Sequence, residues 1–288
     1  MKFIYKVPGY LLLIFGGFCL SWGGLLVKSF ETTDAWKILL LRSFFFFLGV
    51  SVFLLSIYKK DALKTIKKAG LAGLSGGFVM SFSFIAFVFA MMNTSVANVV
   101  FIISTQTMFL AIFGYFYLKE KVSIIGLLSI ILAMMGITVM IGDSISGGTL
   151  FGNLVALTIP ISFSILVIII RKNSNLDLIP AIWYGSASSV LISFFMTSDL
   201  SFTNNDILMG FLLGVPQLTF GFVCITIGSR TTKSVTIGLL MLTETIFAPF
   251  WVWLFLNEIP PLSVFIGGTI IVFAIIIKTL DKSKQISA

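Results

Sequence analysis

The sequence predicts an all-α membrane protein with ten transmembrane helices, arranged as two inverted five-helix repeats. Three observations support this prediction. Of the 288 residues, 58% are hydrophobic and only 10% are charged, whereas a soluble domain has about 25% charged residues. The apolar residues are grouped in ten long segments with short connections. The two halves of the chain also repeat short residue patterns at fixed offsets.

The apolar segments are long enough to cross a bilayer, since a hydrocarbon core of about 30 Å requires about 20 helical residues. The first segment follows Lys2 and Lys6 and continues to about Val27, which is too long for the apolar region of a cleavable signal. The predicted spans are 9–28, 36–58, 69–92, 95–118, 122–141, 150–170, 179–197, 206–228, 234–256 and 261–278. No connection is long enough to form a soluble domain.

The basic residues predict the orientation, because cytoplasmic loops of membrane proteins collect lysine and arginine. With a cytoplasmic N-terminus, 16 of the 19 basic residues lie on the cytoplasmic side, and only Lys28, Lys37 and Arg42 lie on the outer side. The outer acidic residues are Glu31, Asp34, Asp143, Asp199, Asp206 and Glu258. We expect a multi-pass protein of the bacterial inner (plasma) membrane with both termini in the cytoplasm. The net charge of +8 arises from these loops, so we do not expect nucleic-acid binding.

Several classes of chemistry lack the residues that they need. The chain has no histidine, and its two cysteines, Cys19 and Cys224, lie inside apolar segments. No metal site, disulfide framework or cofactor is therefore expected. The chain also lacks the P-loop pattern, so we do not expect ATP-driven pumping by this chain alone.

The two halves align at two offsets, which divides the chain into repeats of residues 1–145 and 146–288. An offset of 143 sets Gly9, Ser21 and Lys28 on Gly152, Ser164 and Arg171. An offset of 138 sets Thr105-Gln106-Thr107 on Thr243-Glu244-Thr245 and Glu120 on Glu258. Since each half contains five spans, an odd number, the second half must enter the membrane from the opposite side.

Inverted repeats are typical of transporters that work by alternating access, with a site near the midplane between the halves. The sequence therefore favours a secondary active transporter of a small-molecule substrate. Two other classes stay open, a channel-like or non-transporting membrane protein and an intramembrane enzyme. An enzyme would need clustered titratable residues at one depth, and every aspartate lies in a loop or at a span edge.

The chain resembles the EamA family of the drug/metabolite transporter superfamily. The resemblance is carried by Trp22-Gly23, Lys28, Arg42, the block from Ala97 to Glu120, Gly136-Ile137, Leu242-Thr243-Glu244, Ala248-Pro249, Asn257-Glu258 and Gly267-Gly268. It implies a basket of helices around a central cavity, lined by spans one, three, four, six, eight and nine, with spans five and ten behind. The first half has Met108 and Phe109 where the family often has a proline. We therefore expect span four to be stiffer than span nine, which contains Pro249.

Glu244 is the most informative candidate residue, because it lies near the middle of span nine. An ionised carboxylate there must pair, face a wet cavity or become protonated. It could bind a substrate ammonium group or couple transport to protons, or it could be a neutral structural group. Gln106, its repeat partner, and Asn98 could face the same cavity or bond a neighbouring helix.

Arg42 could bind a substrate carboxylate, or it could pair with Glu31 or Asp34 near the outer surface. Together with Glu244 it favours amino acids, amines or related zwitterions as substrates. Lys28 and Arg171 each close the first helix of a repeat and are candidates for anchoring or gating. Glu120 and Glu258 are expected to be structural.

Aromatic residues could also line the cavity through stacking or cation–π contacts. The candidates are Phe18, Trp22, Phe82, Phe220 and Trp183, although lipid-facing or core packing explains any one of them equally well. Trp251 and Trp253 fit an outer aromatic belt. The lipid bilayer is an expected partner, and the sequence leaves both a monomer and a homodimer open.

Overall fold

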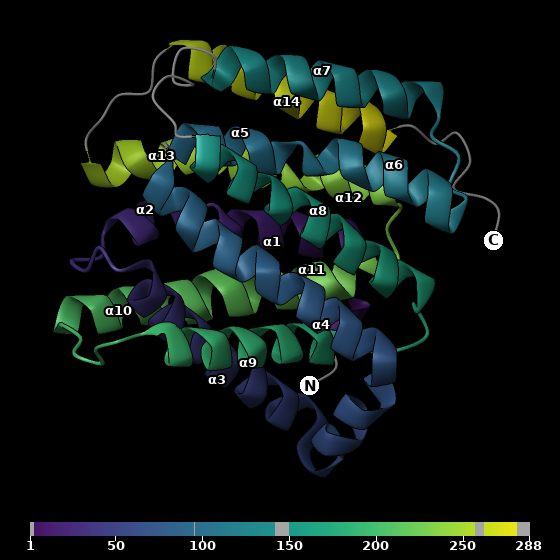
Figure 1. The fold of residues 1–288 in the computed structure, drawn as a ribbon. Coiled ribbons are helices and arrows are strands. Elements are labelled where there is room, and N and C mark those ends of the chain that lie inside the picture. The colour runs from purple at the N-terminus through teal and green to yellow at the C-terminus, as the bar shows by residue number, and fades with distance from the viewer. Residues whose placement is uncertain (1–2, 95, 142–149, 257–261, 281–288) are drawn as a thin grey trace.

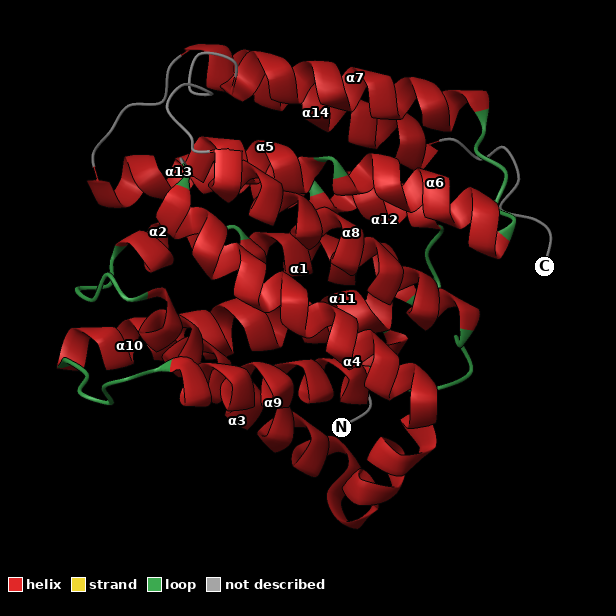
Figure 2. Cartoon of the chain, in the orientation of Figure 1, coloured by secondary structure: helices red, strands yellow, loops and turns green. Residues whose placement is uncertain are grey.

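Helices are the only regular elements that the computed structural model contains in residues 3–94, 96–141, 150–256 and 262–280, the part of the chain that it describes (Figure 1, Figure 2). Eight helical stretches in this part are long and apolar enough to cross a membrane. The prediction of an all-helical, multi-pass membrane protein is thus confirmed. Five charged residues used for the predicted orientation lie outside the described residues: Lys2, Asp143, Glu258, Lys282 and Lys284.

The first half begins with a short 3-10 turn and continues through a series of α-helices. Asp34 starts the long helix α3, because its side chain accepts a hydrogen bond from the backbone N–H of Trp36 at 2.8 Å. The elements are η1 (Phe3–Lys6), α1 (Gly9–Leu20), α2 (Gly23–Lys28), α3 (Ala35–Tyr58), η2 (Lys59–Asp61), α4 (Ala62–Asn93), α5 (Val96–Ser104), α6 (Gln106–Leu118) and α7 (Ile124–Ile141).

The second half is built in the same way. Thr203 caps the helix that follows it, because its hydroxyl accepts a hydrogen bond from the backbone N–H of Asp206 at 3.1 Å. The elements are α8 (Leu150–Lys172), α9 (Ile179–Met196), α10 (Asn204–Leu212), the π-helical segment η4 (Leu213–Thr219), α11 (Phe220–Ser229), α12 (Ser234–Met241), α13 (Thr243–Leu256) and α14 (Leu262–Leu280).

The helical stretch Ala35–Asn93 is 59 residues long and changes direction in the middle. A straight helix of this length would measure about 90 Å, roughly three times the hydrocarbon thickness. The backbone reverses at two positive φ angles, Lys59 (φ 48°) and Gly70 (φ 50°). Glycine adopts such an angle readily because it has no Cβ atom. The predicted edges of spans two and three, residues 58 and 69, fall at these two positions.

Two of the predicted spans are each divided into two helices. The predicted span 95–118 consists of α5 and α6 and turns at Thr105 (φ −64°, ψ −11°). The predicted span 234–256 consists of α12 and α13 and turns at Leu242 (φ −63°, ψ −9°). The lack of a proline in span four therefore does not keep it straight, whereas its stiffness relative to span nine stays a prediction. The first span breaks without a proline, and the second breaks well before Pro249, which lies inside α13.

The helices form layers, which Figure 1 shows from the side. Helices α7 and α14 pack against each other along one edge of the molecule. Helix α4 packs on α8 and α9, and α1 packs on α11, in the interior. Close approach depends on glycine: a Cβ atom at Gly77 would lie 2.5 Å from the carbonyl oxygen of Ala181. The core is filled by large apolar side chains such as Phe46, Met80 and Leu166.

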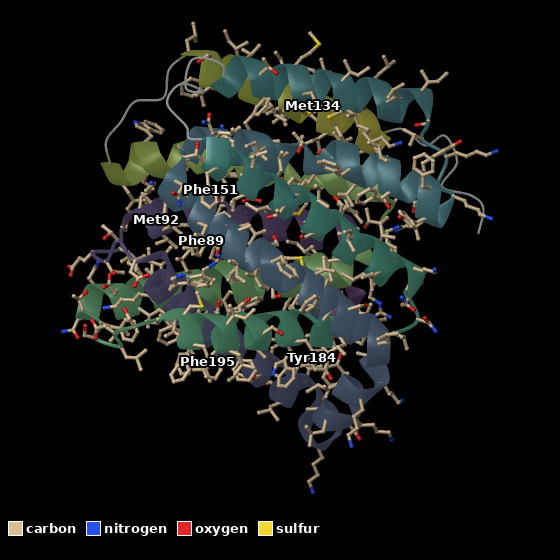
Figure 3. All side chains as sticks on the ribbon, in the orientation of Figure 1. Phe89, Met92, Met134, Phe151, Tyr184 and Phe195 are labelled. Carbon is tan, nitrogen blue, oxygen red and sulfur yellow. The ribbon has the colours of Figure 1, made fainter. Side chains whose placement is uncertain are left out.

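The outer surface of the bundle is apolar. Phe195 on α9 is 80% exposed and lies at the lower edge of the bundle in Figure 3, and Phe151 on α8 is 58% exposed. Many further large apolar side chains are exposed on the same helices. Apolar patches of this extent are rare on soluble monomers, so this surface is one that suits a lipid environment.

Candidate functional site: a polar cavity between two broken helices

A small cavity with polar walls lies in the interior of the bundle. Its volume is about 40 Å³, which is room for one or a few water molecules, since one water needs about 10–15 Å³. Its lining residues are Leu20, Arg42, Ser83, Phe84, Phe87, Ile103, Gln106, Ile159, Phe163, Gln217, Leu218, Phe222, Met241 and Glu244. They come from both halves of the chain. The helices that the family resemblance assigns to the lining all contribute, and α3 contributes as well through Arg42. Helices α7 and α14 contribute none.

Glu244 and Gln106 each follow a break in a helix. We call Thr105-Gln106-Thr107 and Thr243-Glu244-Thr245 the two threonine turns. In each turn the first threonine hydroxyl donates a hydrogen bond of 2.6 Å to a carbonyl three residues earlier, that of Ile102 or Leu240. Such a side chain competes with the backbone N–H groups for helix carbonyls. The local sequence thus explains why both spans break here.

The break places Glu244 in the first turn of α13. The unpaired N–H groups at a helix start carry partial positive charge, which stabilises a carboxylate. Among the described residues, no basic nitrogen lies within 4.0 Å of Glu244. Its side chain lines the cavity and is partly accessible. Glu244 is therefore a carboxylate in an apolar bundle that can reach a small ligand or a water molecule.

Arg42 is a buried cation on another wall of the same cavity, with only 2% of its surface exposed. Its Nη1 donates a hydrogen bond to the carbonyl of Phe84 at 3.1 Å, and its guanidinium lies 4.7 Å from the ring centre of Phe87. Its Nε has no hydrogen-bond partner. It does not pair with Glu31 or Asp34, the alternative that the sequence left open. The cavity thus has a cation and a carboxylate in its walls.

Gln217 is a polar residue of the cavity that the sequence reasoning missed. It lies in the π-helical segment η4, directly after Pro216, and is 3% exposed. Its Nε2 donates to the carbonyl of Leu20 at 3.2 Å, and its Oε1 has no partner. A glutamine in the middle of a span, beside a proline, was the available signal. π-Helical turns occur frequently at functional sites.

Two phenylalanine candidates lie away from the cavity. Phe82 and Phe220 are 50% and 52% exposed and do not line it. Their neighbours two residues later, Phe84 and Phe222, line it instead. Two residues turn a helix by about 200°, so the sequence identified the correct level of each helix but the wrong face.

The remaining aromatic candidates belong to other contacts. Trp22 stacks on Trp251 with ring centres 3.8 Å apart, and Phe18 meets the same ring edge-on at 5.4 Å. Trp251 is 7% exposed, so it does not belong to an outer belt, whereas Trp253 is 44% exposed. The indole of Trp183 donates to Ser51 Oγ at 2.9 Å. None of the three candidates Phe18, Trp22 and Trp183 lines the cavity.

Asn98 also lies away from the cavity lining. It is buried in α5, and its Nδ2 donates to Thr94 Oγ1 at 3.0 Å. Thr94 in turn donates to Asn153 Oδ1 at 2.8 Å, which joins α8 to this contact. The geometry fits the alternative of hydrogen bonding between neighbouring helices.

Lys28 and Arg171 have different surroundings although they are equivalent in the repeat. Lys28 ends α2 and is exposed. Arg171 ends α8, forms an ion pair with Glu120 and donates to the carbonyl of Thr232. Glu120 also accepts a hydrogen bond from the backbone N–H of Ser234 at 3.0 Å, at the start of α12. Arg171 and Glu120 therefore tie α6, α8 and α12 together at one end of the bundle.

A second contact near this end involves the N-terminal turn. The hydroxyl of Tyr5 donates to Asp177 Oδ2 at 2.6 Å, and the hydroxyl of Tyr58 bonds the same oxygen. Burial, followed by the nearby carboxylate of Asp177, raises the pKa of Tyr5 above its ordinary value. Tyr5 is therefore a neutral donor at neutral pH, and η1 is fixed to the end of α3 and to the start of α9.

An apolar bundle with a charged and polar cavity inside it defines a multi-pass membrane protein of the transporter class. A sequence model of the EamA-like transporter family matches residues 7–142 and, a second time, residues 150–280. The chain therefore belongs to the EamA-like transporter family.

Two further comparisons agree with this assignment. An uncharacterized transporter of Clostridium kluyveri is 26% identical over 263 residues, which cover 83% of this chain and 82% of that protein. A protein of known crystal structure superposes with a TM-score of 0.77 at 16% identity, covering 94% of this chain and 96% of the other. The second likeness concerns the fold alone.

Proposed function

We propose that this membrane transporter carries small metabolites by secondary active transport, most specifically amino acids, amines or related zwitterions. One observation supports the proposal above all: Arg42, Gln106 and Glu244, from three different spans, line the same interior cavity. A cation and a carboxylate on the walls of one cavity complement the carboxylate and the ammonium group of a zwitterion.

The proposed transport cycle requires a change of conformation. Binding sites for small molecules have volumes of about 300–1,000 Å³, much larger than the 40 Å³ of this cavity. The helices around it must move apart to admit a substrate, and alternating access describes such a movement on either side of the membrane in turn. The broken spans α5–α6 and α12–α13 are suitable places for it, because each has a backbone break beside the cavity.

We propose ten transmembrane helices in two inverted five-helix repeats, residues 1–145 and 146–288. The eight spans identified by length increase to ten when Ala35–Asn93 counts as two crossings and the shorter helix Ile124–Val139 is added. The double match of the family and the breaks at Thr105 and Leu242, which lie within one residue of equivalent positions, support the repeat. Five crossings in each half require opposite orientations.

The proposed orientation has both termini in the cytoplasm of a bacterium, with the protein in the inner membrane. The charge distribution supports it. Single cysteines at residues 63 and 203, added to a variant without Cys19 and Cys224, test it. A membrane-impermeant thiol reagent should label position 203 in intact cells and position 63 only after the cells are opened. The reverse pattern would contradict the orientation.

Countertransport in proteoliposomes tests the transport mechanism. With candidate amino acids and amines, we expect saturable uptake that accelerates when the vesicles are preloaded with the same compound. A channel-like protein would show uptake without this acceleration, and a non-transporting protein would show none. A small-molecule substrate and the surrounding lipid are the partners that this proposal requires, in a monomer or in a homodimer.

A further inference from the structure

We infer that Gln217 is a substrate-binding residue of the cavity: its Oε1 accepts a hydrogen bond from the ammonium group of a zwitterion whose carboxylate pairs with Arg42. The inference rests on the proposed function and extends it to a residue with no role so far. It also narrows the substrate class to amino acids with an apolar side chain.

The orientation of the Gln217 amide is fixed by its neighbour. Nε2 donates to the carbonyl oxygen of Leu20 at 3.2 Å. An amide oxygen cannot donate, so exchanging the two ends of the amide would set two acceptors against each other. Oε1 must therefore take the other position, where it has no hydrogen-bond partner.

A buried acceptor without a partner is unfavourable and uncommon in protein interiors. Gln217 is 3% exposed, and the cavity that it lines contains a second group of this kind, Arg42 Nε, on a residue that is 2% exposed. Gln217 Oε1 requires a hydrogen-bond donor, and Arg42 Nε requires an acceptor. A ligand that carries both, an ammonium group and a carboxylate, would satisfy the two groups together.

Gly23 lies close to side chains beside both groups. A Cβ atom at Gly23 would lie 2.9 Å from both Gln217 Nε2 and Phe87 Cζ. Phe87 in turn packs its ring against the guanidinium of Arg42. The absence of a side chain at Gly23 therefore leaves room for both the amide and the ring.

The rest of the lining indicates what the substrate carries besides its charged groups. Leu20, Ile103, Ile159, Phe163 and Met241 are apolar and surround the same cavity. Glu244, another lining residue, supplies a second oxygen acceptor for an ammonium group. An amino acid with an apolar side chain matches this combination of one cation, two acceptors and an apolar wall.

Thermal-shift titrations of the purified full-length protein test the inference. The probes are the twenty standard amino acids and, for those that raise the melting temperature, the matching amine without the carboxylate and the matching acid without the amine. Ligands that bind only the folded state raise this temperature. We expect Gln217→Leu to bind the amino acid and the amine at least about tenfold more weakly than the wild type does, and to bind the acid with unchanged affinity.

Two variants serve as controls. Gln217→Asn keeps an amide with both a donor and an oxygen acceptor, and should bind the amine more tightly than Gln217→Leu. Gly268→Ala lies on α14, outside the lining, and should bind all probes unchanged. If Gln217→Leu binds the amine as tightly as the wild type, or weakens amine and acid equally, the inference is overturned while the proposed function stands. If no amino acid shifts the wild type, the proposed substrate class fails and the inference with it.

Discussion

The two threonine turns, Thr105-Gln106-Thr107 and Thr243-Glu244-Thr245, share a threonine hydrogen bond and differ in charge. Each breaks a span beside the cavity, and in each the first threonine bonds a carbonyl three residues earlier. The central residue is a neutral amide in the first half and a carboxylate in the second. The duplicated architecture therefore does not require duplicated chemistry. The second turn supplies a carboxylate, and the first supplies a neutral amide.

The third residues of the turns connect the halves to each other. Thr107 donates to the carbonyl of Gly238 on α12 at 3.1 Å, and Thr245 lies 3.4 Å from the hydroxyl of Ser104 on α5. Each turn thus touches the broken span of the other half. A conformational change in one turn can therefore alter the position of the other. Both the difference in charge between the turns and the contact between them can be tested by mutation.

Making the two turns chemically equal should have the largest effect. Glu244→Gln places an amide in both turns and removes the carboxylate from the cavity that Arg42 also lines. We expect the rate of coupled transport in proteoliposomes to fall by about 100-fold or more, as for loss of a charged contact worth roughly 3 kcal/mol. Glu31→Gln, the same change at an exposed outer residue, is the control. Wild-type rates and pH dependence in Glu244→Gln would remove Glu244 from the mechanism.

Exchanging the central residues of the two turns should restore part of the transport rate that Glu244→Gln loses. The double variant Gln106→Glu with Glu244→Gln moves the carboxylate to the other turn, where it still faces the cavity. We expect transport about tenfold above that of Glu244→Gln alone, yet below the wild type, because Arg42 and the apolar wall stay in place. Uptake no better than in the single variant would show that the two turns are not equivalent around the substrate.

The contact between the turns should be sensitive to volume. A Cβ atom at Gly238 would lie 2.7 Å from Thr107 Cα, whereas at Gly268 it would meet nothing within 4 Å. We expect Gly238→Ala to lower the free energy of unfolding by about 1–3 kcal/mol through overpacking, seen as a lower melting temperature in detergent. Gly268→Ala is the matched control in another membrane helix. Equal melting temperatures in the two variants would contradict the close contact.

Removing single hydroxyls should have the smallest effect. Thr107→Val and Thr245→Val keep the side-chain shape and lose one hydrogen bond each, which is worth about 0.6 kcal/mol on average in a membrane protein. We expect Thr107→Val to destabilise the protein more, because its bond at 3.1 Å is shorter than the 3.4 Å contact of Thr245. A lower melting temperature for Thr245→Val than for Thr107→Val would indicate that the hydrogen bond of the second turn contributes more to the contact between the halves.

The sequence predicted the spans well because hydrophobicity reports directly on burial in lipid. The edges of α3, α8 and α9 lie within about three residues of the predicted ones, within the usual uncertainty of element boundaries. The Thr-Gln-Thr and Thr-Glu-Thr pairing also led to the cavity. Proline positions do not predict the helix breaks, because the hydrogen bonds that compete for helix carbonyls come from Thr105 and Thr243.

The face of each helix was harder to predict. Phe78, Phe82, Phe84, Phe87 and Phe89 lie in one part of α4. Ser81 and Ser83 are the only polar residues among them, too few to form a polar stripe that marks the inner side. Lipid and protein interior are both apolar, and amphipathic periodicity therefore carries little information. Only the packing of α4 against its neighbours decides that Phe84 and Phe87 face inward and Phe82 does not.

Helices α7 and α14 pack against each other at one edge, and neither contributes a residue to the cavity. An imaging fiducial or a fluorescent probe fixed to the outer side of this pair would therefore leave the ligand chamber untouched. Met135, which is 58% exposed on α7, is a convenient attachment point. A dye there, paired with one on α10, would report how the distance between this pair and α10 changes.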